Sequence, residues 1–479
     1  MYTTRLMRTT LWALLLSLTL GLTGGMDLRT EQALAADEAQ QERVSLPIVN
    51  NRSCGGLKQP GPFGVQMFGT TGATNRFNPS LLESGAQWVR AEIDWRRVEP
   101  ENTNPPTYNW DYVDRTLRAV VDTCVNMIVT HEYNPDWAAT SPHGPVDRVP
   151  VSRMADYLAA FAERYDGDGF NDAPGSPRVR YFELYNEPDA TGPGINRWAH
   201  HGAEYAQMLA TVYPAMKAAN PDVQVVFAGI AYDWFEDLGG PFVRHFLDDV
   251  LAAGGGAHFD VMNFHVYPPF AGNWTTNGGP GLYEKTQAVR AKLAEFGVSK
   301  PIVITEAGHH SNANAPIAGS PEHQVKNLVK LYTQTVAAGV EFTAWFLLYD
   351  LGGTYEYESG LVTNATPPQK KPAFFAYQQA IKMLSKVQPD HRLTPAETGA
   401  ADMEAYRFLD FVNNRVLYVA WLNPLDAGGQ KLLTVDGAAG TVIDVFGGAT
   451  PITDGSDGSV DGKLSVAISA MPVYIVVPN

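Results

Sequence analysis

Cysteine and positive charge are both scarce in this sequence. Its 479 residues include two cysteines, Cys54 and Cys124, and 35 lysines and arginines against 51 aspartates and glutamates, which gives a formal net charge of -16. The negative charge argues against nucleic acid or an anionic membrane surface as a partner. A disulfide between the two cysteines is permitted if the protein is exported. A buried Cys124 beside an unpaired Cys54 is equally consistent with the sequence.

Long apolar runs are also missing, apart from a short one near the N-terminus. There, Arg5 and Arg8 precede an apolar run over residues 11–20, and the sequence ALA at 33–35 offers a cleavage site between small residues. The run is shorter than the roughly 20 residues that span a bilayer. We therefore predict a signal peptide over residues 1–35 and a secreted or extracytoplasmic protein with no membrane contact beyond export. The polar stretch before the cleavage site leaves an uncleaved anchor as the alternative.

Strand-like and helix-like patterns alternate eight times between about residues 61 and 386. The strand-like apolar runs are Phe63–Met67, Trp88–Trp95, Asn126–Tyr133, Val179–Asn186, Val223–Ile230, Phe259–Tyr267, Pro301–Glu306 and Phe342–Tyr349. Nearly continuous apolar strands alternating with amphipathic helices are typical of a closed parallel (β/α)8 TIM barrel. An open doubly wound sheet would also alternate, but no glycine-rich dinucleotide turn follows the first run. We therefore predict an α/β barrel.

The pattern changes near residue 387. Residues 387–479 carry short alternating apolar runs separated by Gly, Asp and Asn, which predicts a small C-terminal all-β sandwich domain. Residues 36–60 look irregular and form an N-terminal lead that could add a strand to this sandwich. Because no linker rich in Ser or Thr precedes the sandwich, we expect it to be docked against the barrel.

Two glutamates at strand ends are the most informative feature of the chain. Glu187 follows the run YFELYN at 181–186, and Glu306 closes the run PIVITE at 301–306. In a parallel barrel the C-terminal strand ends form one face, so these two carboxyl groups are expected to meet there. Cleavage of a glycosidic bond by double displacement needs such a pair, about 5–5.5 Å apart. One must hold a proton for the leaving oxygen while the other attacks the sugar as a carboxylate.

Other polar and aromatic residues fall at the same predicted face. Those at the strand ends are Asp94, Trp95, His131, Glu132, Asn186, His265, Tyr267, Trp345 and Tyr349, and Arg90 points inward from the second strand. Asp94 and Glu132 are expected to be polar walls of the groove. Glu183, inside the fourth strand, is expected to be the buried partner of a basic residue.

These motifs resemble clan A glycoside hydrolases, the 4/7 superfamily. The segments that carry the resemblance are Asn186-Glu187-Pro188, Glu306, Trp88-Val89-Arg90, Asn134-Pro135-Asp136-Trp137 and His265-Val266-Tyr267-Pro268. It covers residues 60–385, and the trailing β module resembles that of families 39, 30, 51 and some members of family 5. Among these, family 39 or a relative in family 5 is the nearest match. The resemblance implies a retaining glycosidase that acts on an oligo- or polysaccharide with β linkages and needs no cofactor.

The resemblance also implies a role for single residues. Glu187 would be the acid/base and Glu306 the nucleophile. Asn186 would bond the 2-hydroxyl of the sugar, Arg90 would hold the nucleophile ionised, and Tyr267 would donate to it.

Three further residues would line the same subsite. The resemblance implies that Trp345 is a platform under the sugar and that His131 and His265 line the pocket around it. Aromatic rings suit this position because sugar rings present apolar C–H faces.

Two other classes of protein remain compatible with these residues. His131, Glu132, His265 and Glu306 could converge on a metal ion, but metal-dependent hydrolase barrels usually carry His-x-His on the first strand, which reads FGVQM here. We therefore expect no metal at the site. A carbohydrate-binding barrel without catalytic activity is the second alternative, although nothing in the sequence indicates that activity is lost.

One acidic loop resembles a calcium site. Asp166–Asp172 reads DGDGFND, with oxygen side chains at alternate positions, but it lacks an Asp or Asn at the fifth position and a clear terminal glutamate. A solvated turn is the simpler interpretation, and a structural calcium site is the alternative.

Overall fold

The computed structural model describes residues 60–479 except 69–70, 122, 193–194, 269–272 and 275–278. The predicted signal peptide, the N-terminal lead up to residue 59 and Cys54 lie outside these residues. Cys124 takes part in a disulfide, and no cysteine of the described part is free. None of the described helices has the length and apolar character needed to cross a membrane.

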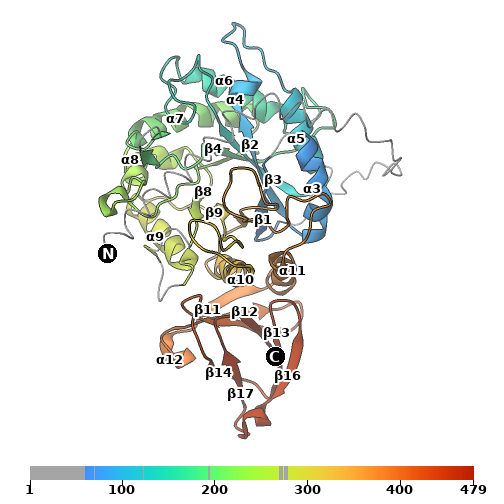
Figure 1. Ribbon diagram of the computed structural model, residues 1–479. Helices are drawn as coiled ribbons and strands as arrows, with labels where there is room; N and C mark the ends of the chain where they lie inside the picture. Colours follow the sequence, from blue (N-terminus) through green and yellow to red (C-terminus); the bar gives the residue numbers. More distant parts are fainter. Residues whose placement is uncertain (1–59, 69–70, 122, 193–194, 269–272, 275–278) are drawn as a thin grey trace, which may run out of the picture.

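Eight parallel strands form a barrel (Figure 1). They are β1 (Phe63–Gln66), β2 (Trp88–Asp94), β3 (Asn126–Glu132), β4 (Tyr181–Leu184), β7 (Gln224–Val226), β8 (Met262–Val266), β9 (Ile302–Ala307) and β10 (Thr343–Trp345). Their order in the sheet is β7-β4-β3-β2-β1-β10-β9-β8. Parallel bridges from Val226 to Val261 and from Ile230 to Phe264 join β7 to β8 and close the ring. The predicted (β/α)8 TIM barrel is confirmed.

Helices surround this barrel. They are α3 (Thr71–Ser84), α4 (Trp95–Val98), α5 (Asp111–Val121), α6 (Ser152–Arg164), α7 (Gly202–Ala219), α8 (Phe246–Ala252), α9 (Leu282–Glu295), α10 (Pro321–Ala337) and α11 (Pro372–Leu384). Local sequence sets their ends, as at α10, where the Ser320 hydroxyl accepts a hydrogen bond from His323 N and Pro321 occupies the first turn. A small hairpin, β5 (Thr191–Gly192) with β6 (Ile195–Asn196), follows β4.

Apolar side chains fill the barrel interior near the N-terminal ends of the strands. They are Trp88, Ile128, Val226, Val261, Val303 and Phe342. The rings of Trp88 and Phe342 stack with centroids 4.3 Å apart. Side chains along a strand alternate between its faces, so the next inward residues toward the C-terminal end are Arg90 on β2 and Thr130 on β3. The barrel is therefore apolar at its base and polar toward its mouth.

An antiparallel β module follows the barrel, as predicted. Its elements are β11 (Gln388–Arg392), α12 (Pro395–Thr398), β12 (Met403–Asp410), β13 (Arg415–Leu422), β14 (Lys431–Asp436), β15 (Ala439–Ile443), β16 (Ala449–Thr453), β17 (Lys463–Ile468) and β18 (Val473–Pro478). One sheet has the order β11-β12-β13-β18-β15-β16, and β14 pairs with β17 in a second. The two sheets enclose their own core, which includes Leu433, Leu464 and Ile475.

The β module packs against the barrel beside α10 and α11 (Figure 1). Polar contacts reinforce this packing: Gln334 Nε2 donates to Glu404 Oε1 over 2.6 Å, and Lys330 Nζ donates to the Leu422 carbonyl over 3.3 Å. Because the module covers its outer face, α10 is buried along the whole stretch 324–336.

Candidate active site

Arg90 is the centre of a polar network inside the barrel. Its side chain is completely buried on β2. Nε and Nη2 donate to the two carboxylate oxygens of Glu183 over 2.7 and 3.1 Å. Nη1 donates to Gln66 Oε1 and Glu306 Oε1 over 2.7 and 2.6 Å, and Nη2 also donates to Asn186 Oδ1 over 2.8 Å. These five contacts use all five N–H groups of the guanidinium.

Glu183 on β4 is the buried partner of Arg90, which confirms the sequence prediction. It also accepts hydrogen bonds from Thr130 Oγ1 over 2.6 Å, Asn263 Nδ2 over 2.9 Å and Gly229 N over 3.1 Å. With both oxygens occupied by several donors, Glu183 fixes Arg90 in place rather than taking part in chemistry.

A β-bulge in β9 turns Glu306 into the same network. The parallel register pairs Asn263 with Val303 but His265 with Glu306, so β9 carries one extra residue over this stretch. Bulges of this kind re-aim side chains near active sites. As a result both Thr305 and Glu306 point into the barrel, and Thr305 Oγ1 lies 2.9 Å from Asn263 Nδ2.

Two residues hold the Glu306 carboxylate from opposite sides. Arg90 Nη1 lies 2.6 Å from Oε1, and the Tyr267 hydroxyl, just after β8, donates to Oε2 over 2.5 Å. A cation and a neutral donor favour the charged form of a carboxyl group. The Glu306 carboxyl group therefore has a fixed orientation.

Glu187 lies on a sharp turn directly after β4. Tyr185 and Glu187 have φ angles of 71° and 42°. Residues other than glycine rarely have positive φ angles, and those that do occur often at functional sites. A hydrogen bond of 3.0 Å from Glu187 N to Gly229 O holds the turn. The turn directs the Glu187 side chain toward His265, whose Nδ1 lies 3.1 Å from Glu187 Oε1.

The two carboxyl groups meet at the mouth of the barrel. Oxygens of Glu187 and Glu306 and a nitrogen of His265 all lie within 4.8 Å of one another. Burial raises the pKa of Glu187 to about 7 and lowers the pKa of His265 to about 4. Glu187 thus holds a proton in weakly acidic solution while His265 is neutral. A dication among these groups would lie beside the Arg90 guanidinium, which disfavours a metal site there.

Asn186, between the two residues of positive φ, is held by its amide oxygen. Its Oδ1 accepts from Arg90 over 2.8 Å, and its backbone N–H donates to Glu132 Oε1 over 3.3 Å. This leaves the Asn186 amide nitrogen as the group that would donate to a ligand. The structure therefore brings together Glu187, Glu306, Arg90, Asn186, His265 and Tyr267.

His131 is not brought into this site. Its ring stacks on Phe182 with centroids 5.5 Å apart and meets Phe161 edge-on at 4.4 Å. These contacts lie on the helix side of β3, because the neighbouring Thr130 already points inward to Glu183 and strand side chains alternate. The subsite role implied for His131 is corrected accordingly: it is a neutral core residue, with a pKa lowered by burial to about 3.

Trp345 is also turned away from the site. It is completely buried in the main core, and its Nε1 donates to the Ser359 carbonyl over 3.0 Å. The next residue, Phe346, faces Tyr267 with ring centroids 5.9 Å apart, and Tyr355 lies 6.2 Å from Phe346. The aromatic wall is thus one residue further along the chain than predicted. Counting alternate residues from the inward Phe342 would have found it.

A second polar cluster, at the end of β3, was only partly visible in the sequence. Glu132 accepts from Arg197 Nη1 over 3.1 Å and lies 3.2 Å from His143 Nδ1. Arg197 also donates to the Asn186 carbonyl and is almost completely buried. The Glu132–Arg197 pair therefore holds the loop that carries Asn186 and Glu187. No local signal marks Arg197, which follows the β5–β6 hairpin.

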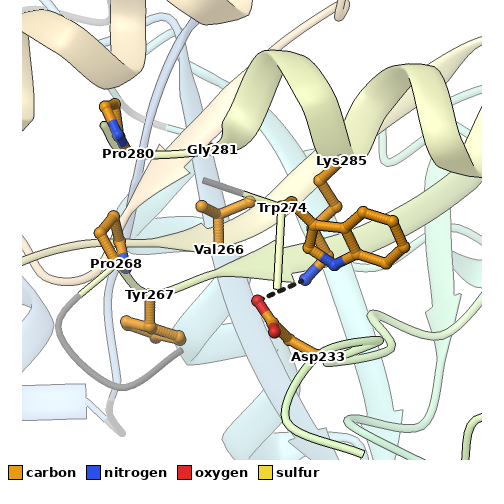
Figure 2. Close-up of a pocket in the computed structure, with 8 residues that line it drawn as sticks. All are labelled: Asp233, Val266, Tyr267, Pro268, Trp274, Pro280, Gly281 and Lys285. Carbon is orange, nitrogen blue, oxygen red and sulfur yellow. Dashed lines mark ion pairs between the residues drawn. The ribbon is translucent and has the colours of Figure 1, made fainter. Parts of the chain in front are cut away.

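A small open hollow lies beside Tyr267 (Figure 2). Its lining residues are Asp233, Val266, Tyr267, Pro268, Trp274, Pro280, Gly281 and Lys285. Lys285 Nζ lies 4.0 Å from Asp233 Oδ2 and donates to the His265 carbonyl over 2.7 Å. The hollow meets the carboxyl pair through Tyr267, which contacts Glu306.

The Asp166–Asp172 loop lies between α6 and β4. Oxygens of Asp166, Asp168 and Asp172 lie within 4.8 Å of one another. They also accept hydrogen bonds from backbone N–H groups of the loop. Such hydrogen bonds are common in turns that bind no metal ion. The solvated turn stays the prediction and a calcium site its alternative.

Comparison with known proteins identifies structural relatives. No family model and no curated protein matches the sequence. A family 39 glycoside hydrolase from Bacteroides cellulosilyticus WH2 is 20% identical with a TM-score of 0.64, over 87% of this chain and 81% of that one. A family 30 subfamily 8 xylanase from Clostridium acetobutylicum is 13% identical with a TM-score of 0.57, over 88% and 97%. These relatives are clan A glycoside hydrolases, and at such identities the likeness shows the fold.

Proposed function

We propose that this chain is a secreted retaining glycoside hydrolase that cleaves β-linked O-glycosidic bonds in an oligo- or polysaccharide. The observation that carries the proposal is the pair Glu187 and Glu306, whose oxygens lie within 4.8 Å at the mouth of the barrel. Carboxyl groups about 5–5.5 Å apart serve retaining cleavage, whereas inverting enzymes separate them by about 6.5–9.5 Å to admit a water molecule. The apolar run at residues 11–20 supports export.

In the first step the two carboxyl groups act in opposite ways. Glu187, with its pKa raised to about 7 by burial, gives its proton to the leaving oxygen. Glu306, oriented by Arg90 and Tyr267, attacks the anomeric carbon and forms a glycosyl ester as the C–O bond to the leaving group breaks. The Asn186 amide is placed to donate to the neighbouring hydroxyl of the sugar.

In the second step Glu187 acts as a base. Formation of the ester removes the negative charge of Glu306, and Glu187 has just lost its proton. Glu187 then takes a proton from a water molecule, which attacks the anomeric carbon and releases Glu306. Both displacements invert the anomeric centre, so the product keeps the starting configuration.

A panel of aryl β-glycosides and β-glycans tests this function, with Glu306→Gln and Glu341→Gln run beside the wild-type protein. Glu341 lies after α10, at the opposite end of the barrel, and serves as the matched control. We expect turnover of at least one substrate by the wild type and the control and its loss in Glu306→Gln. Binding of a glycan without turnover by any of the three proteins would instead indicate a carbohydrate-binding protein.

A further inference from the structure

Glu92 is a carboxyl group at the mouth of the barrel that the two-step mechanism does not use. It follows Arg90 by two residues on β2, so its side chain points to the same side of the strand. β2 and β8 lie opposite each other in the ring, which places Glu92 across the mouth from Tyr267 at the end of β8. Its side chain is 14% exposed, whereas that of Arg90 is completely buried. Glu92 therefore lies nearer to an incoming ligand than Arg90 does.

The Glu92 carboxyl group has only long contacts with its polar neighbours. Gln66 Nε2 lies 3.4 Å from Oε1 and Arg90 Nη1 lies 3.9 Å away, and within the described residues no other hydrogen bond reaches this carboxyl group. Ordinary hydrogen bonds of this type are about 2.7–3.2 Å long. Burial raises the pKa of Glu92 to about 8, and Glu132 and Glu306 add to this effect against the opposing charge of Arg90. The raised pKa favours the protonated form, and the two long contacts leave this carboxyl group able to form further hydrogen bonds.

The cationic side chains around the site already form hydrogen bonds and ion pairs within the protein. All five N–H groups of Arg90 have acceptors. Arg197 binds Glu132 and the Asn186 carbonyl. Lys285 donates to the Ala231 and His265 carbonyls. A negatively charged ligand would therefore meet several carboxyl groups, and among the described residues no lysine or arginine in contact with the site is left without a partner. Burying such a charge is costly. The mouth therefore favours an uncharged ligand.

An aromatic wall begins at Tyr267, across the mouth from Glu92, and continues to Phe346 after β10. Tyr267, Phe346 and Tyr355 follow one another with ring centroids 5.9 and 6.2 Å apart. A sugar ring between the two walls would place its apolar C–H face on these rings and its hydroxyl groups toward β2. We infer that Glu92 binds a ring hydroxyl of the sugar whose glycosidic bond is cut, and that this sugar is neutral. The inference rests on the proposed function, whose site it completes.

A pair of variants of matched size tests the role of Glu92. Glu92→Gln keeps the length and a hydrogen-bonding end, whereas Glu92→Met keeps the length without it. On the best neutral aryl glycoside we expect kcat/KM to fall about 10- to 100-fold in Glu92→Met and less than about fivefold in Glu92→Gln. Thermal unfolding, with Glu341→Gln as the control, establishes that each variant is folded, and Glu92→Ala replaces Glu92→Met if the latter is not.

A series of monodeoxy glycosides separates a contact from a structural effect. One glycoside of the series lacks the hydroxyl that Glu92 contacts. On this glycoside we expect kcat/KM of the wild type to fall by about the same factor as kcat/KM of Glu92→Met falls on the parent substrate. Glu92→Met loses no more on that glycoside, because the two changes remove the same interaction. The wild type is also expected to cleave the matched uronide, which carries a carboxylate, at least about 100-fold more slowly than the neutral glycoside.

The outcomes separate this inference from the proposed function. No turnover of any glycoside by the wild type overturns the proposed function and this inference with it. Turnover that Glu92→Met leaves unchanged, additive losses across the whole deoxy series, or faster cleavage of the uronide overturns the inference about Glu92 and leaves the proposed function standing.

Discussion

Arg90 Nη1 lies 2.6 Å from Glu306 Oε1, although the two residues are 216 positions apart in the chain. The same guanidinium binds both oxygens of Glu183 on β4. One buried cation therefore joins β2, β4 and β9 and also orients the proposed nucleophile. The stability of the barrel and the geometry of the site depend on the same group.

Removal of Arg90 is expected to destabilise the fold as well as abolish turnover. Arg90→Met leaves Glu183 and Glu306 buried without their cation, which costs about 3–5 kcal/mol of unfolding free energy. The double variant Arg90→Met/Glu183→Met is expected to recover part of this loss, because it removes both partners of the central ion pair. Urea unfolding measures both values, and a double variant no more stable than Arg90→Met would contradict the prediction.

Replacement of Glu187 is expected to affect substrates according to their leaving group. Glu187→Ala removes the proton donor, so kcat/KM falls by about 100-fold or more for an alkyl glycoside. A dinitrophenyl glycoside needs no proton on its leaving group, and its bond is still cleaved to form the glycosyl ester. Added azide is expected to accelerate turnover of that substrate by Glu187→Ala, since it replaces water in the second step. An equal loss for both substrates would contradict the role of acid/base.

The activity is expected to decline as the pH rises through neutrality. Burial raises the pKa of Glu187 to about 7, so the proton donor is lost above that pH. The value of kcat/KM for a poor leaving group should fall about tenfold per pH unit on the alkaline side. A kcat/KM that stays constant to pH 9 would contradict the assignment.

The same pKa predicts how Glu187 affects stability. The group binds its proton up to about pH 7 in the folded state but only up to its ordinary value of 4.5 when unfolded. The free energy of unfolding therefore falls as the pH rises from 4.5 to about 7. Above that pH, this destabilisation by Glu187 is at its maximum. Glu187→Gln should raise the Tm by roughly 3–6 °C at pH 8 and leave it unchanged at pH 4. Equal Tm values at pH 8 would contradict this.

Phe346 and Trp345 are expected to respond in opposite ways to substitution. Trp345→Ala opens a cavity in the core and should cost about 3–5 kcal/mol of unfolding free energy. Phe346→Ala, at the mouth, should raise KM for a glycoside several-fold with a smaller loss of stability. Kinetics and thermal unfolding of the two neighbours provide the comparison. A larger effect of Trp345→Ala on KM in a fully folded protein would restore Trp345 as the platform.

Much of the fold follows from periodicity in the sequence. Eight apolar runs alternating with amphipathic stretches predict the barrel, because both faces of a parallel sheet are covered. The change to short alternating runs after residue 386 predicts the β module. Glu187 and Glu306 could be placed at one face because both close such runs.

The remaining details of the site depend on effects that periodicity does not encode. Strand parity decides that Thr130 points inward and His131 outward, and a shift of one residue exchanges them. The bulge in β9 turns both Thr305 and Glu306 inward, against strict alternation. Arg197 reaches Glu132 from a loop whose path no local pattern describes.

Trapping the glycosyl ester is a direct test of double displacement through Glu306. A 2-deoxy-2-fluoro glycoside with a dinitrophenyl leaving group, built on the sugar that the protein cleaves best, slows the second step more than the first. We predict time-dependent inactivation and one fluoroglycosyl group on the peptide that contains Glu306, found by mass spectrometry. A label on another residue, or a protein that cleaves the parent glycoside but is not inactivated, would contradict double displacement through Glu306.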